Sequence, residues 1–359
     1  MELEDHFRGI TRRDWEQESV DGTVRIAIVG VGGFARNRAL PGIEAGEYCE
    51  TTVLVTSSPE TVATEPIAAD ADHCIDYDAF KSGDYADAYD AVYVSTPNAL
   101  HGEYAIAAAE QGAHVICEKP LETSVERAQA VVDACEDAGV TLMTAYRHQT
   151  EPIVRRAREV VANEVIGDVV QIHADFSHPL LEETEPDTWR LDPELAGGGA
   201  LVDLGIYPLN SIRFLLECEP VCVYANTYTE PPFEPVDRDV AFQLELPTGA
   251  TASCTASYDA HAGSQLKLVG TDGSVLVSSP FGGVVPHEIR VEYDDVCMEY
   301  TGEPTDEVRE EFDYFGYCVL TGTTPEPDGQ DGVADLAVVE AAYESVDERC
   351  EVPVDVDRS

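Results

Sequence analysis

Lysine is scarce in this chain, which contains three lysines and 18 arginines among its 359 residues. The 70 aspartates and glutamates far exceed the 21 basic residues, and the formal net charge is -49. A surface with so few cations repels phosphate backbones and anionic lipids, which excludes nucleic acids and membrane surfaces as partners. Apolar residues make up 44% of the chain, enough for a large core, so the acidic excess does not indicate disorder.

An acidic surface with arginine in place of lysine is typical of cytoplasmic proteins from halophilic archaea. In molar salt the Debye length shrinks to roughly 3 Å, so the repulsion within a coat of carboxylates is screened. In dilute buffer the repulsion between these carboxylates is not screened. We therefore expect the protein to unfold or lose activity when salt is removed.

The chain also lacks the usual patterns of metal and disulfide sites. Its ten cysteines include no CxxC pair, and its histidines form no cluster at ligand spacing, so we expect no metal and no disulfide framework. No apolar run approaches the roughly 18 residues that a spanning helix needs. Residues 1–23 are charged throughout and form an N-terminal arm without a signal or anchor, so a cytoplasmic location is expected.

Residues 24–147 alternate short β-branched segments with alanine-rich helical patterns at residues 99–111 and 123–138. The predicted strands are VRIAIVG, TTVLVTS, AVYVSTP, HVICEKP and TLMTAY. This alternation predicts an α/β Rossmann domain with a doubly wound parallel sheet.

Residues 148–359 follow a different pattern. A helix at about 152–163 precedes strictly alternating segments such as VAFQLELP and TASCTASY, and an amphipathic helix is predicted at 331–348. The pattern predicts an α+β domain with a large, mostly antiparallel open sheet. Because one face of such a sheet is available, we expect a homo-oligomer, a dimer or tetramer formed through this sheet, although a solvated acidic face is the alternative.

The segment GVGGFA at residues 30–35 follows a strand and opens a helix. Gly30 can make the tight turn, Gly32 lets the backbone approach a pyrophosphate, and Ala35 allows close helix packing. The amide groups at the helix N-terminus would bind the phosphates, together with the loop residues Gly33 and Phe34. The order of strand, glycines and helix favours a dinucleotide site over a simple turn.

The end of the second strand indicates which dinucleotide is bound. An NAD site places a carboxylate on the ribose there, but the residues at this point are Thr56, Ser57 and Ser58. Glu60 comes too late in the turn to replace that carboxylate. The serine hydroxyls with a guanidinium from Arg36 or Arg38 suit a 2′-phosphate, so we predict NADP, with NAD bound at lower affinity. Serines at strand ends are also common turn residues.

Lys119 ends the apolar segment HVICEKP, whereas Lys81 and Lys267 lie in polar or alternating stretches. Ligands of open α/β sheets bind at the carboxyl ends of the strands, so we expect the Lys119 ammonium at the ligand site. The segment STPNALH at residues 95–101 is a second strand end, where proline and asparagine fit a strand stop and helix cap equally well. The predicted cofactor contacts from both segments are Thr96, Pro97, Asn98, His101, Glu118 and Lys119.

The segment AGGGALVDLGIYPLN at residues 196–210 places polar residues on one predicted helical face. Asp203, Tyr207 and Asn210 follow one another at four- and three-residue spacing. A polar row on an apolar helix indicates a site, and internal hydrogen bonding is the alternative.

The segments GVGGFA, STPNALH, EKP, AYRHQTEP and WRLDPELAGGGALVDLGIYPLN together give a clear resemblance. From about Val24 the chain resembles the glucose-fructose oxidoreductase, inositol dehydrogenase and rhizopine-catabolism (Gfo/Idh/MocA) family. The resemblance implies that Lys119, Asp203 and Tyr207 flank the substrate. Tyrosine in place of histidine at 207 resembles the branch of aldose-oxidising enzymes and dihydrodiol dehydrogenases.

The resemblance implies NADP-dependent oxidation of an aldose at its anomeric carbon to an aldonolactone. D-xylose is the leading substrate, and D-glucose or another aldose is the alternative. Tyr207 would act as base, an ammonium at Lys119 would favour its phenolate, and Asp203 would orient the lysine or a sugar hydroxyl. The expected pocket walls are Tyr146, Arg147, Trp189 and Arg190. The other hypotheses are an oxidoreductase that keeps its nucleotide bound and a non-enzymatic NADP-binding regulator.

Overall fold

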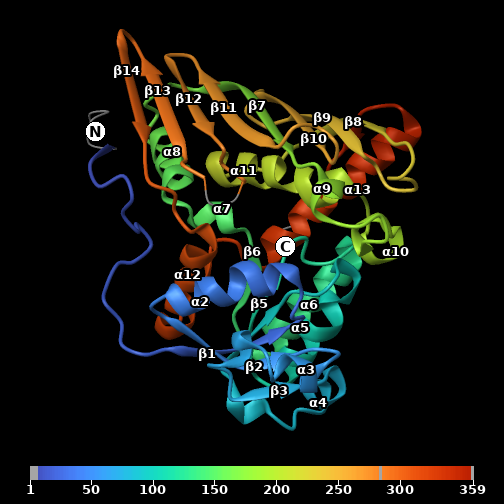
Figure 1. Cartoon of the computed structure of the whole chain (residues 1–359). Coiled ribbons are helices and arrows are strands. Elements are labelled where there is room, and N and C mark those ends of the chain that lie inside the picture. Colours follow the sequence, from blue (N-terminus) through green and yellow to red (C-terminus); the bar gives the residue numbers. More distant parts are fainter. Residues whose placement is uncertain (1–6, 283–284, 357–359) are drawn as a thin grey trace. The chain divides into compact units, whose positions relative to one another are not determined.

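The computed structural model describes residues 7–282 and 285–356, which form two compact units (Figure 1). We call residues 14–147 and 306–333 the parallel-sheet unit. Residues 7–13, 148–282, 285–305 and 334–356 form the large-sheet unit. The segment 306–333, which the sequence pattern assigned to the second domain, packs with the first. Within the described residues, no helix is long and apolar enough to cross a membrane.

The parallel-sheet unit contains a six-stranded sheet in the order β3-β2-β1-β4-β5-β6, and all its strand pairs are parallel. The strands are β1 (Val24–Val29), β2 (Cys49–Val55), β3 (His73–Ile75), β4 (Ala91–Val94), β5 (His114–Glu118) and β6 (Leu142–Ala145). The strand order reverses between β1 and β4, and nucleotides bind outside the carboxyl ends of strands at such a point. The predicted doubly wound Rossmann fold is confirmed.

Helices cover both faces of this sheet (Figure 1). The helical segments are η1 (Ala35–Ala39), α2 (Leu40–Ala45), α3 (Pro59–Val62), η2 (Pro66–Ala68), α4 (Tyr77–Ser82), η3 (Ala86–Ala88), η4 (Asn98–Leu100), α5 (His101–Glu110), α6 (Val125–Ala138) and α12 (Glu307–Thr321). Only the first residue of α7 (Arg147–Thr150) belongs to this unit. The Ser124 side chain caps α6 by accepting from the Arg127 amide, and Gly139 at φ 68° ends it. The helices expected at 99–111 and 123–138 correspond to η4 with α5 and to α6.

Residues 14–23 of the N-terminal arm contribute to the core of the parallel-sheet unit. Trp15 is 7% exposed and lies against Tyr314 and Tyr317 of α12, with ring centroids 5.4 and 5.5 Å apart. The arm is therefore a packed segment from about residue 14 onward.

The large-sheet unit contains a nine-stranded sheet in the order β14-β13-β12-β11-β7-β10-β9-β8-β15. The neighbouring strands are antiparallel except for the parallel pair of β7 and β10. The strands are β7 (Val169–Ser177), β8 (Cys222–Tyr228), β9 (Asp239–Glu245), β10 (Thr251–Ser257), β11 (Gly263–Gly270), β12 (Gly273–Ser278), β13 (Glu288–Tyr293), β14 (Val296–Thr301) and β15 (Val352–Pro353). The predicted large, mostly antiparallel sheet is confirmed.

Helices cover one face of the large sheet, where the apolar residues of each alternating strand are buried (Figure 1). They are α8 (Pro152–Ala162), α9 (Leu180–Glu183), η5 (Trp189–Leu191), α10 (Pro193–Ala196), η6 (Leu201–Gly205), α11 (Ile206–Leu216) and most of α13 (Gly329–Glu348). The glycine run before η6 is required sterically, because a Cβ on Gly199 would lie 2.1 Å from the Asp237 carbonyl oxygen. The Asp237 carboxylate accepts from the amides of Gly199 and Leu201 and so fixes the start of η6.

Candidate active site

The glycine loop of the parallel-sheet unit has the shape of a phosphate cradle. Gly30 has φ 98°, and a Cβ there would lie 2.5 Å from the Ser95 carbonyl oxygen, so only glycine fits. At Gly32 and Gly33 a Cβ would meet no atom within 4 Å, which leaves open space beside the backbone. This side of the sheet therefore fits the dinucleotide that the sequence predicts.

The residues expected at the 2′-phosphate lie after β2. Ser57 and Ser58 are exposed, and the Ser58 amide donates to the hydroxyl of the preceding Thr56. Arg36 donates from Nε to the Val31 carbonyl oxygen of the glycine loop at 3.0 Å and pairs through Nη1 with Glu65, which follows α3. The guanidinium thus links the glycine loop to the segment that follows the two serines.

Arg38 points to another part of the same unit. Its Nη2 lies 3.7 Å from Asp306 Oδ1 at the start of α12. Of the two arginines proposed for the 2′-phosphate, the geometry therefore favours Arg36, and Arg38 is better placed to hold α12.

A buried charged cluster lies beside the glycine loop and includes the predicted pocket residue Arg147. Its Nε donates to Glu307 Oε1 at 2.8 Å, and its guanidinium lies 5.9 Å from the Phe34 ring centroid. Glu118 at the end of β5 accepts from the Tyr93 hydroxyl at 2.6 Å. Burial first, and then the charge of Glu118, raise the pKa of Glu311 well above its usual value. Glu118 and Arg147 are therefore anchored by protein partners.

His101 clamps the ends of β4 and β5. Its side chain is buried, with Nδ1 2.8 Å from the Pro120 carbonyl oxygen and Nε2 2.9 Å from that of Thr96. Backbone carbonyl oxygens thus lie within hydrogen-bonding distance of both ring nitrogens, and a neutral imidazole donates to one of them. The histidine ties the loop that carries Lys119 to the neighbouring strand end. Asn98 is also buried, at 5% exposure, and Pro97 directly precedes it at the start of η4.

Lys119 stands directly after β5, whose central residues Val115 to Cys117 are fully buried. The lysine itself is half-buried rather than enclosed, because it lies beyond the strand. Its place at the carboxyl end of the sheet agrees with the expected ligand side.

Asp203 is the centre of a polar cluster in the large-sheet unit. Its Oδ2 accepts from Arg190 Nε and from the Tyr258 hydroxyl, both at 3.1 Å. Arg190 also lies over the Trp189 ring, 4.5 Å from its centroid. Burial and the Asp203 charge raise the pKa of Tyr258 well above its usual value, so this phenol stays protonated and donates. Trp189, Arg190 and Asp203, all predicted separately, are thus brought together.

Tyr207 lies in an aromatic environment of the same unit. Its ring centroid is 5.3 Å from that of Phe176, 5.4 Å from His148 and 5.8 Å from Phe281. The side chain is 1% exposed, and Tyr146 of the other unit is buried to a similar degree. His148 and Tyr258 were not identified as site residues from the sequence, although His148 belongs to the segment AYRHQTEP.

Asn210, the third residue of the polar row, forms hydrogen bonds with buried side chains. Asn210 accepts from Gln149 and donates to Asp335, which also pairs with Arg213 at 2.6 Å. Internal hydrogen bonding therefore accounts for Asn210, while Asp203 and Tyr207 remain predicted site residues.

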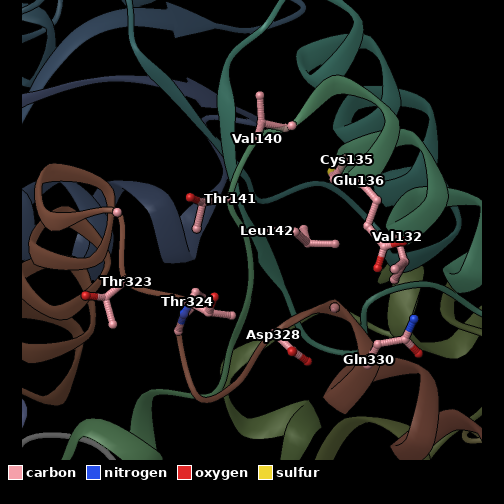
Figure 2. Close-up of a pocket in the computed structure, with 14 residues that line it drawn as sticks. Val132, Cys135, Glu136, Val140, Thr141, Leu142, Thr323, Thr324, Asp328 and Gln330 are labelled. Atoms are coloured by element: carbon pink, nitrogen blue, oxygen red, sulfur yellow. The ribbon is translucent and has the colours of Figure 1, made fainter. Parts of the chain in front are cut away.

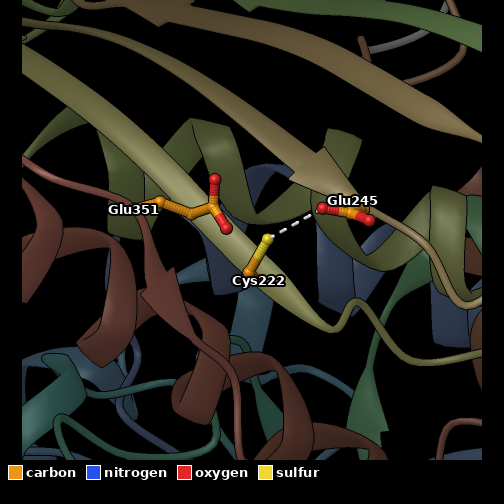
Figure 3. Close-up of side chains that lie close together, drawn as sticks. All are labelled: Cys222, Glu245 and Glu351. Atoms are coloured by element: carbon orange, nitrogen blue, oxygen red, sulfur yellow. Dashed lines mark hydrogen bonds between the residues drawn. The ribbon is translucent and has the colours of Figure 1, made fainter.

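Two other features lie away from these residues. A cavity of about 250 Å³ is bounded by the end of α6, the start of β6 and residues 322–330 (Figure 2). It lies at the amino end of β6 and contains no predicted site residue. In the large-sheet unit, Cys222 Sγ is 3.5 Å from Glu245 Oε2, beside Glu351 (Figure 3). Burial and the two glutamates raise the pKa of Cys222 to about 12, so the free thiol stays protonated.

Comparison with known proteins agrees with this architecture. Residues 24–146 match the oxidoreductase family with an NAD-binding Rossmann fold, and residues 154–276 match the GFO/IDH/MocA C-terminal domain. The chain is 42% identical to D-xylose 1-dehydrogenase [NADP(+)] of Haloarcula marismortui, over 97% of this chain and 98% of that protein. It is 34% identical to D-xylose 1-dehydrogenase (NADP(+)) 2 of Haloferax volcanii, over 91% of this chain and 99% of that protein.

A solved structure leads to the same family. Aldose-aldose oxidoreductase from Caulobacter crescentus, complexed with glycerol, has a TM-score of 0.85 and 32% identity. The match covers 92% of this chain and 99% of that one. With two matching domains and near full-length relatives, the chain belongs to the GFO/IDH/MocA family of oxidoreductases.

Proposed function

We propose that this protein is an NADP-dependent D-xylose 1-dehydrogenase that oxidises the sugar to its aldonolactone. The observation that carries the proposal is the 42% identity, over nearly the whole chain, to an enzyme of that activity. The glycine loop, the serines after β2 and the Asp203 cluster supply the groups that such a reaction needs. D-glucose and other aldoses are the alternative substrates, since pentose and hexose differ by little binding energy, about 1 to 3 kcal/mol.

The proposed chemistry divides between the two units. In the parallel-sheet unit, Gly30, Gly32 and Gly33 would hold the pyrophosphate, and Ser57, Ser58 and Arg36 the 2′-phosphate. Bound NADP supplies the hydride acceptor. Tyr207 is the proposed base that takes the proton from the anomeric hydroxyl, and the ammonium of Lys119 would stabilise its phenolate.

Asp203 is proposed to orient the reacting groups. Its hydrogen bonds from Arg190 and Tyr258 fix the direction of the carboxylate. A carboxylate fixed in this way can accept from a sugar hydroxyl without first losing rotational freedom. Trp189 and Arg190 would contribute an aromatic face and a fork of donors, which suit a polyol.

A substrate panel tests the activity. In molar KCl, purified protein with NADP and D-xylose should produce NADPH, seen by its near-ultraviolet absorbance, and NAD should react with lower kcat/KM. Binding of NADP without turnover of any aldose would contradict the proposal and favour the regulator. Retention of the nucleotide through gel filtration would favour an oxidoreductase that shuttles hydride between two sugars.

We propose further that the protein is a homo-oligomer assembled through the outward face of the large sheet. One row across its five central strands contains no carboxylate, in a chain with 70 acidic residues. From β9 to β12 the row consists of Gln243, Ser253, His173, Lys267 and Leu276. The absence of carboxylates from this row of an otherwise acidic surface supports an interface core, where acidic residues are depleted.

Replacement of Ser253 by glutamate tests this interface. The wild type should elute as a dimer or tetramer in molar salt, measured by size exclusion with light scattering, and Ser253→Glu should elute as a smaller species. Thr324→Glu adds the same charge to an exposed loop of the other unit and should leave the size unchanged. A monomeric wild type would refute the assembly.

The proposed location is the cytoplasm. The described residues include all ten cysteines, and each is a free thiol. Free thiols and the proposed use of NADP as coenzyme are both compatible with a reducing compartment.

A further inference from the structure

We propose that Glu65 sets the coenzyme selectivity by competing with the 2′-phosphate of NADP for the Arg36 guanidinium. The inference rests on the proposed placement of that phosphate at Ser57 and Ser58. Glu65 belongs neither to the glycine loop nor to the two serines. The inference predicts that the native protein binds NADP less tightly than a variant in which no carboxylate competes for Arg36.

The position of Arg36 is the first step. Its Nε is tied to the Val31 carbonyl oxygen, while Nη1 reaches Glu65. Glu65 lies three residues beyond α3, and Ser58 directly precedes α3, with its carbonyl oxygen accepting from the amides of residues 61 and 62. The guanidinium therefore spans the glycine loop and the segment after β2, between which a dinucleotide fold places the adenosine ribose.

The strength of the ion pair is the second step. The side chains of Arg36 and Glu65 are each 31% exposed. An ion pair as open as this contributes little to stability, so a ligand can displace it. A phosphate dianion matches the guanidinium fork in a bidentate manner and is the stronger partner.

The charge left behind is the third step. Once the phosphate holds Arg36, the Glu65 carboxylate has lost its cation and lies beside a dianion. Salt screens this repulsion only partly, because a Debye length of roughly 3 Å in molar salt is similar to the separation of neighbouring groups. Both the lost ion pair and the repulsion act against NADP, and neither acts against NAD, which has a hydroxyl at that position.

The experiment measures Kd for NADP and NAD by calorimetry in molar KCl. Glu65→Gln should lower Kd for NADP by about three- to tenfold and leave Kd for NAD within about twofold. Glu50→Gln removes the same charge from the amino end of β2, at the opposite end of that strand from Ser57 and Ser58, and should change neither value. Arg36→Gln should weaken NADP alone, and in the double variant Glu65→Gln should have little further effect.

The outcomes separate the inference from the proposed site. If Arg36→Gln weakens NADP but Glu65→Gln does not tighten it, the role of Glu65 is overturned and the phosphate site stands. If Arg36→Gln leaves NADP binding unchanged, the phosphate lies elsewhere and the inference falls with it. Equal tightening of NADP and NAD by Glu65→Gln would also overturn it. Melting temperatures of the variants without ligand verify that each is folded.

Discussion

Replacement of Tyr207 by phenylalanine is expected to lower kcat for D-xylose oxidation by about 10²- to 10⁴-fold, the usual contribution of a general base. The ring and its packing against Phe176, His148 and Phe281 stay intact, so only the hydroxyl is lost. Binding of NADP should be unaffected, because its proposed contacts lie in the other unit. Steady-state kinetics with a separate measurement of Kd for NADP provide the test.

Two further variants make the result specific. Tyr293→Phe removes a hydroxyl from the exposed end of β13, in the same unit as Tyr207, and should leave kcat unchanged. Lys119→Met should lower kcat about as much as Tyr207→Phe. Combining the two should cost far less than the product of the single losses, because residues that act as a unit are non-additive. If the fold-loss in kcat of the double variant equals the product of the two single losses, Lys119 and Tyr207 do not act together in one step.

Transfer from molar KCl to about 0.1 M salt should unfold or inactivate the enzyme, because the screening length grows from roughly 3 Å to about 10 Å. The excess carboxylates, which give the net charge of -49, then repel one another across the surface. The core and the buried ion pairs, such as Arg213 with Asp335, are much less sensitive to salt. Loss of stability should therefore follow ionic strength closely.

Thermal unfolding followed by circular dichroism across a KCl series measures this effect. Sorbitol at matched osmolality raises no ionic strength and should restore little of the stability lost at low salt. A melting temperature that does not fall between molar and about 0.1 M KCl would contradict the screening explanation.

The sequence predicted the features that are encoded locally. Strand and helix periodicity indicated both sheets, and GVGGFA marked the phosphate loop, because each depends on residues close together in the chain. The three-residue strand β3 was missed because it is too short for a pattern. Helix α12 was missed as well, and it joins the first unit although it follows the large sheet in sequence.

Features that depend on distant pairings were not predictable. The Tyr258 hydroxyl reaches Asp203 across 55 residues of sequence, and Arg36 meets Glu65 across 29. Nothing in the spacing of these residues indicates the contact. His101 begins α5, and only the structure reveals that its ring nitrogens lie beside the backbone carbonyl oxygens of Pro120 and Thr96.

The role of Tyr207 is tested most directly by a single turnover. Enzyme loaded with NADP is mixed with excess D-xylose in molar KCl, and the first formation of NADPH is followed by stopped-flow absorbance. For Tyr207→Phe we predict a hydride-transfer rate slower by about 10²-fold or more, with the amplitude of the wild type. A variant that transfers hydride at the wild-type rate would contradict Tyr207 as the base.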